Sequence, residues 1–120
     1  MLGFRLYLLQ RITAILIAPL VLVHLGVMIY AIQGGLSAEE ILGRTRGSLV
    51  WGLNYGLFVL AVSIHAAIGL RVVISEALGQ SKIGQNKIGL NKKWLDFITL
   101  ALGLTLLSLG SRAVYAVVWS

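Results

Sequence analysis

The chain has 120 residues, of which 58% are hydrophobic and 12% are charged, and its mean hydropathy is +0.93. Soluble domains carry about 25% charged residues, whereas residues 12–38, 47–70 and 97–111 of this chain carry none. These uncharged stretches exclude an ordinary soluble fold, a nucleic-acid-binding module and a disordered tail. The sequence therefore predicts one integral membrane domain over residues 1–120.

Three apolar segments, residues 4–32, 49–74 and 94–118, are long enough to cross a membrane. Each exceeds the ~20 residues that a helix needs to span the hydrocarbon layer. None shows the alternation typical of a transmembrane β-barrel strand. Between the first two segments, Ser37 and Glu40 form a capping-box pattern, which predicts a short helix from Ala38 to about Gly43. The expected fold is an all-α membrane protein with three transmembrane helices.

Basic residues are distributed unequally between the two ends of these helices. The first loop and the C-terminal end carry three, whereas the N-terminal end and the second loop carry seven: Arg5, Arg11, Arg71, Lys82, Lys87, Lys92 and Lys93. By the positive-inside rule, the N-terminus and the second loop are expected in the cytoplasm. The net charge of +6 is then a topology signal and not a nucleic-acid-binding surface. A start methionine without a transit peptide adds the expectation of a prokaryotic or organelle-encoded gene, with a prokaryotic inner membrane favoured.

The chain contains few groups for catalysis. It has no cysteine, which excludes an iron–sulfur cluster, a cysteine–zinc site and a disulfide built from this chain alone. Its four acidic residues lie near the ends of the apolar segments, with no pair at catalytic spacing. Glu76 is either part of a proton route or a loop acid, and the loop acid is favoured. Any redox chemistry must therefore come from a cofactor or from partner chains.

The only two histidines, His24 and His65, lie inside apolar segments, where polar side chains are costly and often functional. A hydrogen bond to a neighbouring helix and ligation of a metal are both open for them. Ala61 and Gly69 share one helical face with His65, and small residues there would leave room for a flat porphyrin. The GxxxG pattern of residues 52–56 lies about 180° away and favours helix packing on that face.

Two motifs resemble a known family. Segment 9–14, LQRITA, resembles the His-Arg-Ile-Thr-Gly element in the first helix of succinate dehydrogenase membrane-anchor subunits. Segment 65–71, HAAIGLR, followed by Glu76, resembles their His-x-x-x-Gly-x-Arg…Asp element. Three departures from the pattern occur: Gln10 stands for His, Ala14 for Gly, and Glu76 for Asp. The His-Ala-x-Ile-Gly part of the second motif is similar to the D-type subunit, whereas Gly-Leu-Arg and the first-helix motif are similar to the C-type, which is favoured.

The resemblance implies a cytochrome b anchor of succinate:quinone oxidoreductase or fumarate reductase, which forms part of a multi-subunit helix bundle. A second anchor subunit would share haem b, and iron–sulfur and flavoprotein subunits would lie on the inner side. His65 matches the axial haem ligand, and Tyr7 and Arg11 match the quinone-site positions; an interfacial belt residue and a snorkelling cation are the alternatives for this pair. Arg71 is a candidate partner for a haem propionate, with lipid phosphate as the alternative.

The depth of the histidines bears on the number of haems. Counted from Arg11 and Arg71 at the inner boundary, His24 lies about 20 Å deep and His65 about 9 Å deep. The axial nitrogens of one iron are only ~4 Å apart, so the two histidines cannot ligate the same iron. Two haems would use both residues, an arrangement similar to that of diheme anchors of this family. One haem would leave His24 structural, beside the bulky Leu20.

Two other classes of function remain open. A haem-free membrane anchor or assembly subunit would use both histidines for helix packing. A small transporter subunit is disfavoured because the chain has neither a pair of broken helices nor an inverted repeat.

Overall fold

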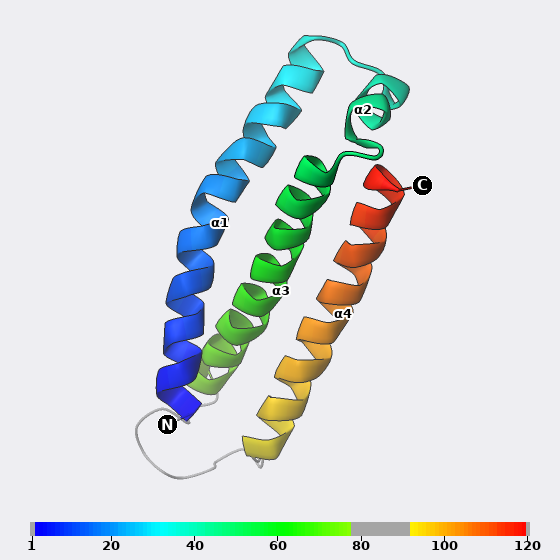
Figure 1. Cartoon of the computed structure of the whole chain (residues 1–120). Helices are drawn as coiled ribbons and strands as arrows, with labels where there is room; N and C mark the ends of the chain where they lie inside the picture. Colours follow the sequence, from blue (N-terminus) through cyan, green and yellow to red (C-terminus); the bar gives the residue numbers. More distant parts are fainter. Residues whose placement is uncertain (1, 78–91, 120) are drawn as a thin grey trace.

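The computed structural model describes residues 2–77 and 92–119, and within these ranges the chain forms helices and no strand. The helices are α1 (Leu2–Gln33), α2 (Ala38–Thr45), α3 (Leu49–Ala77) and α4 (Lys92–Val118). They form an elongated bundle of 56 × 24 × 24 Å, in which α3 packs against both α1 and α4 (Figure 1). Lys82 and Lys87, which contribute to the predicted charge asymmetry, lie outside the described residues.

Three helices are long and apolar enough to span a membrane: Gly3–Gln33, Leu49–Ala77 and Lys93–Val118. The three predicted segments all fall within them, which confirms the expected all-α membrane fold. α3 continues to Ala77 because Ser75 and Glu76 are compatible with a helix and no glycine or proline interrupts it. The prediction that Glu76 is a loop acid was therefore wrong, since Glu76 belongs to the last turn of α3.

The short helix α2 begins at the predicted capping box. The Glu40 N–H donates to Ser37 Oγ at 3.2 Å, and the Ser37 N–H donates to the Glu40 carboxylate at 2.7 Å. The backbone hydrogen bond from Ser37 lowers the pKa of Glu40 below its ordinary value of 4.5. α2 ends at Thr45, two residues beyond the predicted end, because Gly43 is tolerated inside the helix.

The segment after α2 caps the C-terminal end of α4. The last carbonyl groups of a helix have no partner within that helix. Here the Thr45 hydroxyl donates to the Val117 carbonyl at 2.9 Å, and the Gly47 N–H donates to the Val118 carbonyl at 2.7 Å. Gly47 has φ +70°, a left-handed conformation that glycine adopts without steric cost. These bonds hold α2 against the C-terminal end of α4. We call this end of the bundle the α2 end, and it lies opposite the N-terminal end (Figure 1).

Glycines allow α3 and α4 to approach closely. A Cβ on Gly52 would lie 3.0 Å from the Trp119 ring, and a Cβ on Gly110 would overlap the side chain of Val59. Gly56 has nothing within 4 Å of its Cβ position among the described residues. The predicted packing role of the GxxxG pattern is therefore confirmed for Gly52, but the prediction is wrong for Gly56 within this chain. One turn further along, the glycine at the close contact is Gly110 of α4, which packs against Val59 of α3.

Candidate functional site

His65 is held at the contact between α1 and α3. Its Nδ1 lies 3.2 Å from the hydroxyl oxygen of Thr13, which is only 4% exposed. Thr13 belongs to the motif of residues 9–14, but no role was predicted for it. The available signal for a role was that the Thr13 hydroxyl lies only two residues beyond Arg11, which marks the inner boundary. Only the packing of α1 against α3 shows that this hydroxyl contacts His65.

The small residues near His65 have a packing role of their own. A Cβ on Gly69 would lie 3.3 Å from the Gln10 side-chain nitrogen, so Gly69 leaves room for Gln10 from α1. Ala61 is 2% exposed and belongs to the core of the bundle. The space that the sequence suggested for a porphyrin is thus partly used by α1.

A cavity of about 600 Å³ opens between α1 and α3 at the N-terminal end. Its apolar wall includes Leu6, Ile68 and Val72, and its polar lining residues are Tyr7, Gln10, Arg71, Ser75 and Glu76. The side-chain oxygen of Gln10 is buried and has no hydrogen-bond partner among the described residues. Because Gly69 lines the cavity one helical turn from His65, the cavity and the imidazole occupy neighbouring levels of the bundle.

Tyr7 and Arg11 form a pair on the exposed face of α1. The Arg11 Nε donates to the Tyr7 hydroxyl at 3.0 Å, and the guanidinium carbon lies 5.3 Å from the centre of the Tyr7 ring. The shared helical face expected from the sequence is therefore confirmed. Tyr7 lines the cavity, whereas Arg11 lies beside it and outside its lining.

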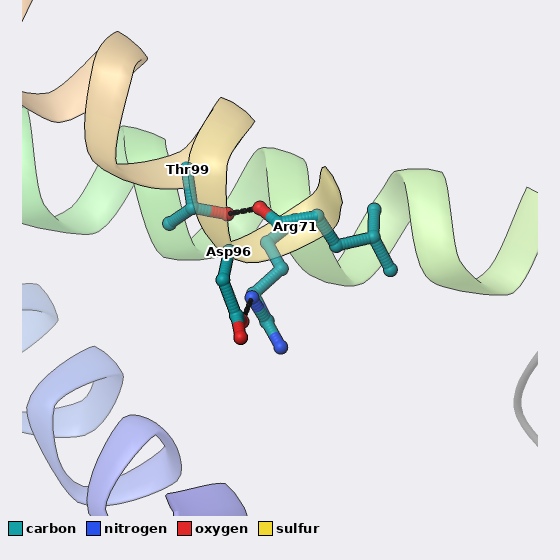
Figure 2. A network of polar contacts seen from close by, with 4 residues as sticks. Arg71, Asp96 and Thr99 are labelled. Carbon is teal, nitrogen blue, oxygen red and sulfur yellow. Dashed lines mark hydrogen bonds and ion pairs between the residues drawn. The ribbon is translucent and has the colours of Figure 1, made fainter. Parts of the chain in front are cut away.

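Arg71 has a partner that was not predicted from the sequence. Its guanidinium forms an ion pair with Asp96 at the start of α4 (Figure 2). The side chain of Arg71 is 13% exposed and that of Asp96 is 48% exposed, so the pair joins α3 and α4 near the surface. Opposite charges at the adjoining ends of two consecutive spans were the signal for this contact.

His24 occupies a different level of the bundle. Its ring stacks on Phe58 at 5.6 Å between centroids and meets the edge of Tyr55 at 6.2 Å. Phe58 and His65 are separated by seven residues of α3, or about 10 Å along the helix axis. This separation agrees with the depth difference expected from the sequence, which excludes ligation of one iron by both residues.

The surroundings of His24 are almost entirely apolar. It lines a cavity of about 340 Å³ toward the α2 end, whose other lining residues include Val27, Tyr55, Phe58 and Val114. Its Nδ1 is buried without a hydrogen-bond partner among the described residues. A buried polar atom without a partner carries a desolvation cost. The Nδ1 of His24 is therefore available for a bond, whereas the Nδ1 of His65 already contacts Thr13.

The three apolar helices and their exposed apolar side chains define an integral membrane protein. A family model described as the succinate dehydrogenase/fumarate reductase transmembrane subunit matches residues 2–109. The chain belongs to this family and is thus a membrane subunit of an oxidoreductase complex, as its motifs indicated. The match does not distinguish C-type from D-type. No curated protein and no solved structure gives a significant match.

Proposed function

We propose that this chain is the cytochrome b anchor of a succinate:quinone oxidoreductase or fumarate reductase. In this proposal it ligates haem b and forms part of the site at which quinone receives electrons from an iron–sulfur subunit. The observation that carries the proposal is the position of His65, an intramembrane imidazole one turn from a cavity with polar lining, in a chain of this family.

The residues around His65 fit a haem ligand. Its Nδ1 is engaged by Thr13, whose hydroxyl oxygen lies 3.2 Å away. Metal-bound histidines commonly hold their second ring nitrogen in this way. Haem b supplies a one-electron carrier when it is bound. Arg71 would contact a propionate from its place in the cavity wall, sharing its guanidinium with Asp96, and the second axial ligand would come from the other anchor subunit.

Tyr7 and Arg11 would bind the quinone beside the cavity at the N-terminal end of the bundle. A guanidinium and a phenol both donate hydrogen bonds to a carbonyl oxygen, and the positive charge of Arg11 stabilises negative charge that develops there. The pair is already aligned by its own hydrogen bond. Because both side chains are exposed in this chain, neighbouring subunits would complete the pocket.

His24 is the proposed ligand of a second haem toward the α2 end. The supporting observations are its separation from His65 and its buried Nδ1 without a partner, which a bond to iron or a hydrogen-bond partner from another group would satisfy. The apolar lining of the adjoining cavity suits a cofactor with a large hydrocarbon surface.

The excess of basic residues at the N-terminal end and in the second loop supports an orientation with this end in the cytoplasm of a prokaryotic cell. The iron–sulfur and flavoprotein subunits would then lie against the end that holds Tyr7, Arg11 and Arg71. A second membrane anchor would pack on the exposed apolar faces of the bundle, and lipid would cover the rest.

The substitution His65→Ala in the assembled complex tests the proposal. We expect the visible spectrum to lose one haem b per complex, because the iron loses an axial ligand. Ser63→Ala removes a buried hydroxyl on the same helix, which donates to its own helix at the Val59 carbonyl, and should leave haem content unchanged. A complex whose haem content is unaffected by His65→Ala, or a wild-type complex without haem b, would contradict the proposal and favour the haem-free anchor.

A further inference from the structure

The hydrogen bonds of Thr13 bear on the tautomer of the neighbouring imidazole. The Thr13 hydroxyl carries one proton and lies 2.8 Å from the Leu9 carbonyl and 3.1 Å from the Gln10 carbonyl. Carbonyl oxygens only accept hydrogen bonds. The shortest contact of the hydroxyl is to one of these acceptors, so its proton is committed to the backbone of α1.

The oxygen of Thr13 therefore presents a lone pair to His65 Nδ1, 3.2 Å away. A hydrogen bond across this contact requires the proton to be on Nδ1. A neutral imidazole has a single N–H, so Nε2 then carries the free lone pair. Thr13 is 4% exposed, which leaves little room for water to replace it as the acceptor.

We propose that Thr13 is a positioning residue that holds His65 in the Nδ1–H tautomer and turns Nε2 toward the iron. This inference rests on the proposed haem-binding function. The opposite tautomer places an N–H where the ligand bond has to form, and it leaves two lone pairs facing each other across the contact between α1 and α3. The hydrogen bond also raises the electron density of the imidazole, which favours the oxidised iron.

The test compares Thr13→Val, which keeps the shape of the side chain but removes the hydroxyl, with Thr13→Ser, which retains it. In the assembled complex, we expect Thr13→Val to raise the midpoint potential of the haem and to accelerate haem loss by about tenfold. Thr13→Ser should remain close to wild type in both measurements, because the serine hydroxyl can still donate to the backbone of α1 and accept from His65 Nδ1.

Thr99→Val is the matched control. Thr99 is partly buried, and its hydroxyl donates to the Leu95 carbonyl of its own helix at 2.7 Å (Figure 2). This control measures how far the loss of a threonine hydrogen bond to its own helix backbone, without a histidine contact, changes the haem potential and the rate of haem loss. An unchanged potential in Thr13→Val, or equal shifts in Thr13→Val and either Thr13→Ser or Thr99→Val, would overturn the assignment.

The outcome is separable from that of the proposed function. If His65→Ala retains all haem, the haem-binding proposal fails, whatever the Thr13 variants show. If His65→Ala loses haem while Thr13→Val matches wild type, only the positioning role fails. Should Thr13→Val not assemble, Thr13→Cys serves in its place, since a thiol is a weak acceptor; a raised potential supports the role and a wild-type potential overturns it.

Discussion

At the scale of single residues, several polar side chains of the membrane spans are held by partners one helical turn away or on the next helix. Arg11 bonds to Tyr7 within α1, Thr13 joins α1 to His65, and Arg71 joins α3 to Asp96. An ionic or polar group in a low-dielectric environment is costly unless it is paired. The pairs therefore define a side-chain geometry at the N-terminal end before any other subunit is added.

Arg11→Ala is expected to lower quinone reduction by the complex by roughly tenfold to hundredfold, which corresponds to the loss of one charged hydrogen bond. Succinate oxidation with an artificial acceptor should stay near wild type, because in the proposed complex another subunit would hold the dicarboxylate site. The measurement is the ratio of the two activities in purified membranes.

Arg5→Ala is the control for Arg11→Ala, since Arg5 is an exposed cation on the same helix and, unlike Arg11, is not paired with Tyr7 among the described residues. Tyr7→Phe, which removes the hydroxyl but keeps the ring, should lower quinone reduction less than Arg11→Ala does. A parallel fall of both activities in Arg11→Ala would indicate an assembly role and contradict the quinone assignment.

At the scale of the helices, the contact between α3 and α4 depends on small residues at particular positions. Gly110 faces Val59, whose β-branched side chain has few alternative rotamers in a helix. Gly52 faces Trp119 near the α2 end. The approach of the two helices is thus set by one glycine from each, and not by a pair on the same helix.

Gly110→Ala is expected to destabilise the complex by about 1–3 kcal/mol through overpacking against Val59. Thermal denaturation of the detergent-solubilised complex measures the effect as a lowered Tm. The double variant Gly110→Ala with Val59→Ala should recover part of the loss because the obstructing methyl groups are gone.

Gly43→Ala provides the matched control, since a Cβ at this position in α2 meets nothing within 4 Å. It should leave the Tm unchanged or raise it slightly, because alanine is the better helix former. Equal destabilisation by Gly43→Ala and Gly110→Ala would show that the loss does not come from the contact with Val59.

At the scale of the whole molecule, the bundle has a thin core and an apolar exterior. Among the described residues few apolar side chains are buried, and Ala61, Ala67 and Ile68 on the central helix α3 are three of them. Large apolar side chains such as Ile15 and Val50 are more than 70% exposed. This surface suits contact with lipid and other membrane subunits, and the proposed haems would lie against it with ligands from a second anchor.

The two-haem proposal predicts a ratio of two haem b groups per complex. His24→Ala should lower this ratio to one and leave the haem ligated by His65 in place, because the two histidines lie at separate levels of the bundle. Haem and protein determinations on the purified complex give the ratio. A value of one that His24→Ala does not change would assign His24 a structural role beside Phe58.

Much of the fold could be predicted from the sequence because membrane insertion depends on local chain properties. Span length, hydropathy and the Ser37–Glu40 capping box are encoded in consecutive residues, and all were confirmed to within a few residues. The motif around His65 indicated the family in the same way. Glu76 was misplaced because the end of a helix is weakly encoded where no glycine or proline stops it.

What the sequence by itself determined is the class of molecule, the spans, the family motifs and the two intramembrane histidines. The tertiary structure decided which side chains meet: Thr13 with His65, Gln10 with Gly69, and Asp96 with Arg71. These contacts join different helices, and their register depends on helix rotation and close packing across the whole bundle. Hydropathy is nearly indifferent to rotation when a helix is apolar on every side, so no local pattern in the chain specifies them.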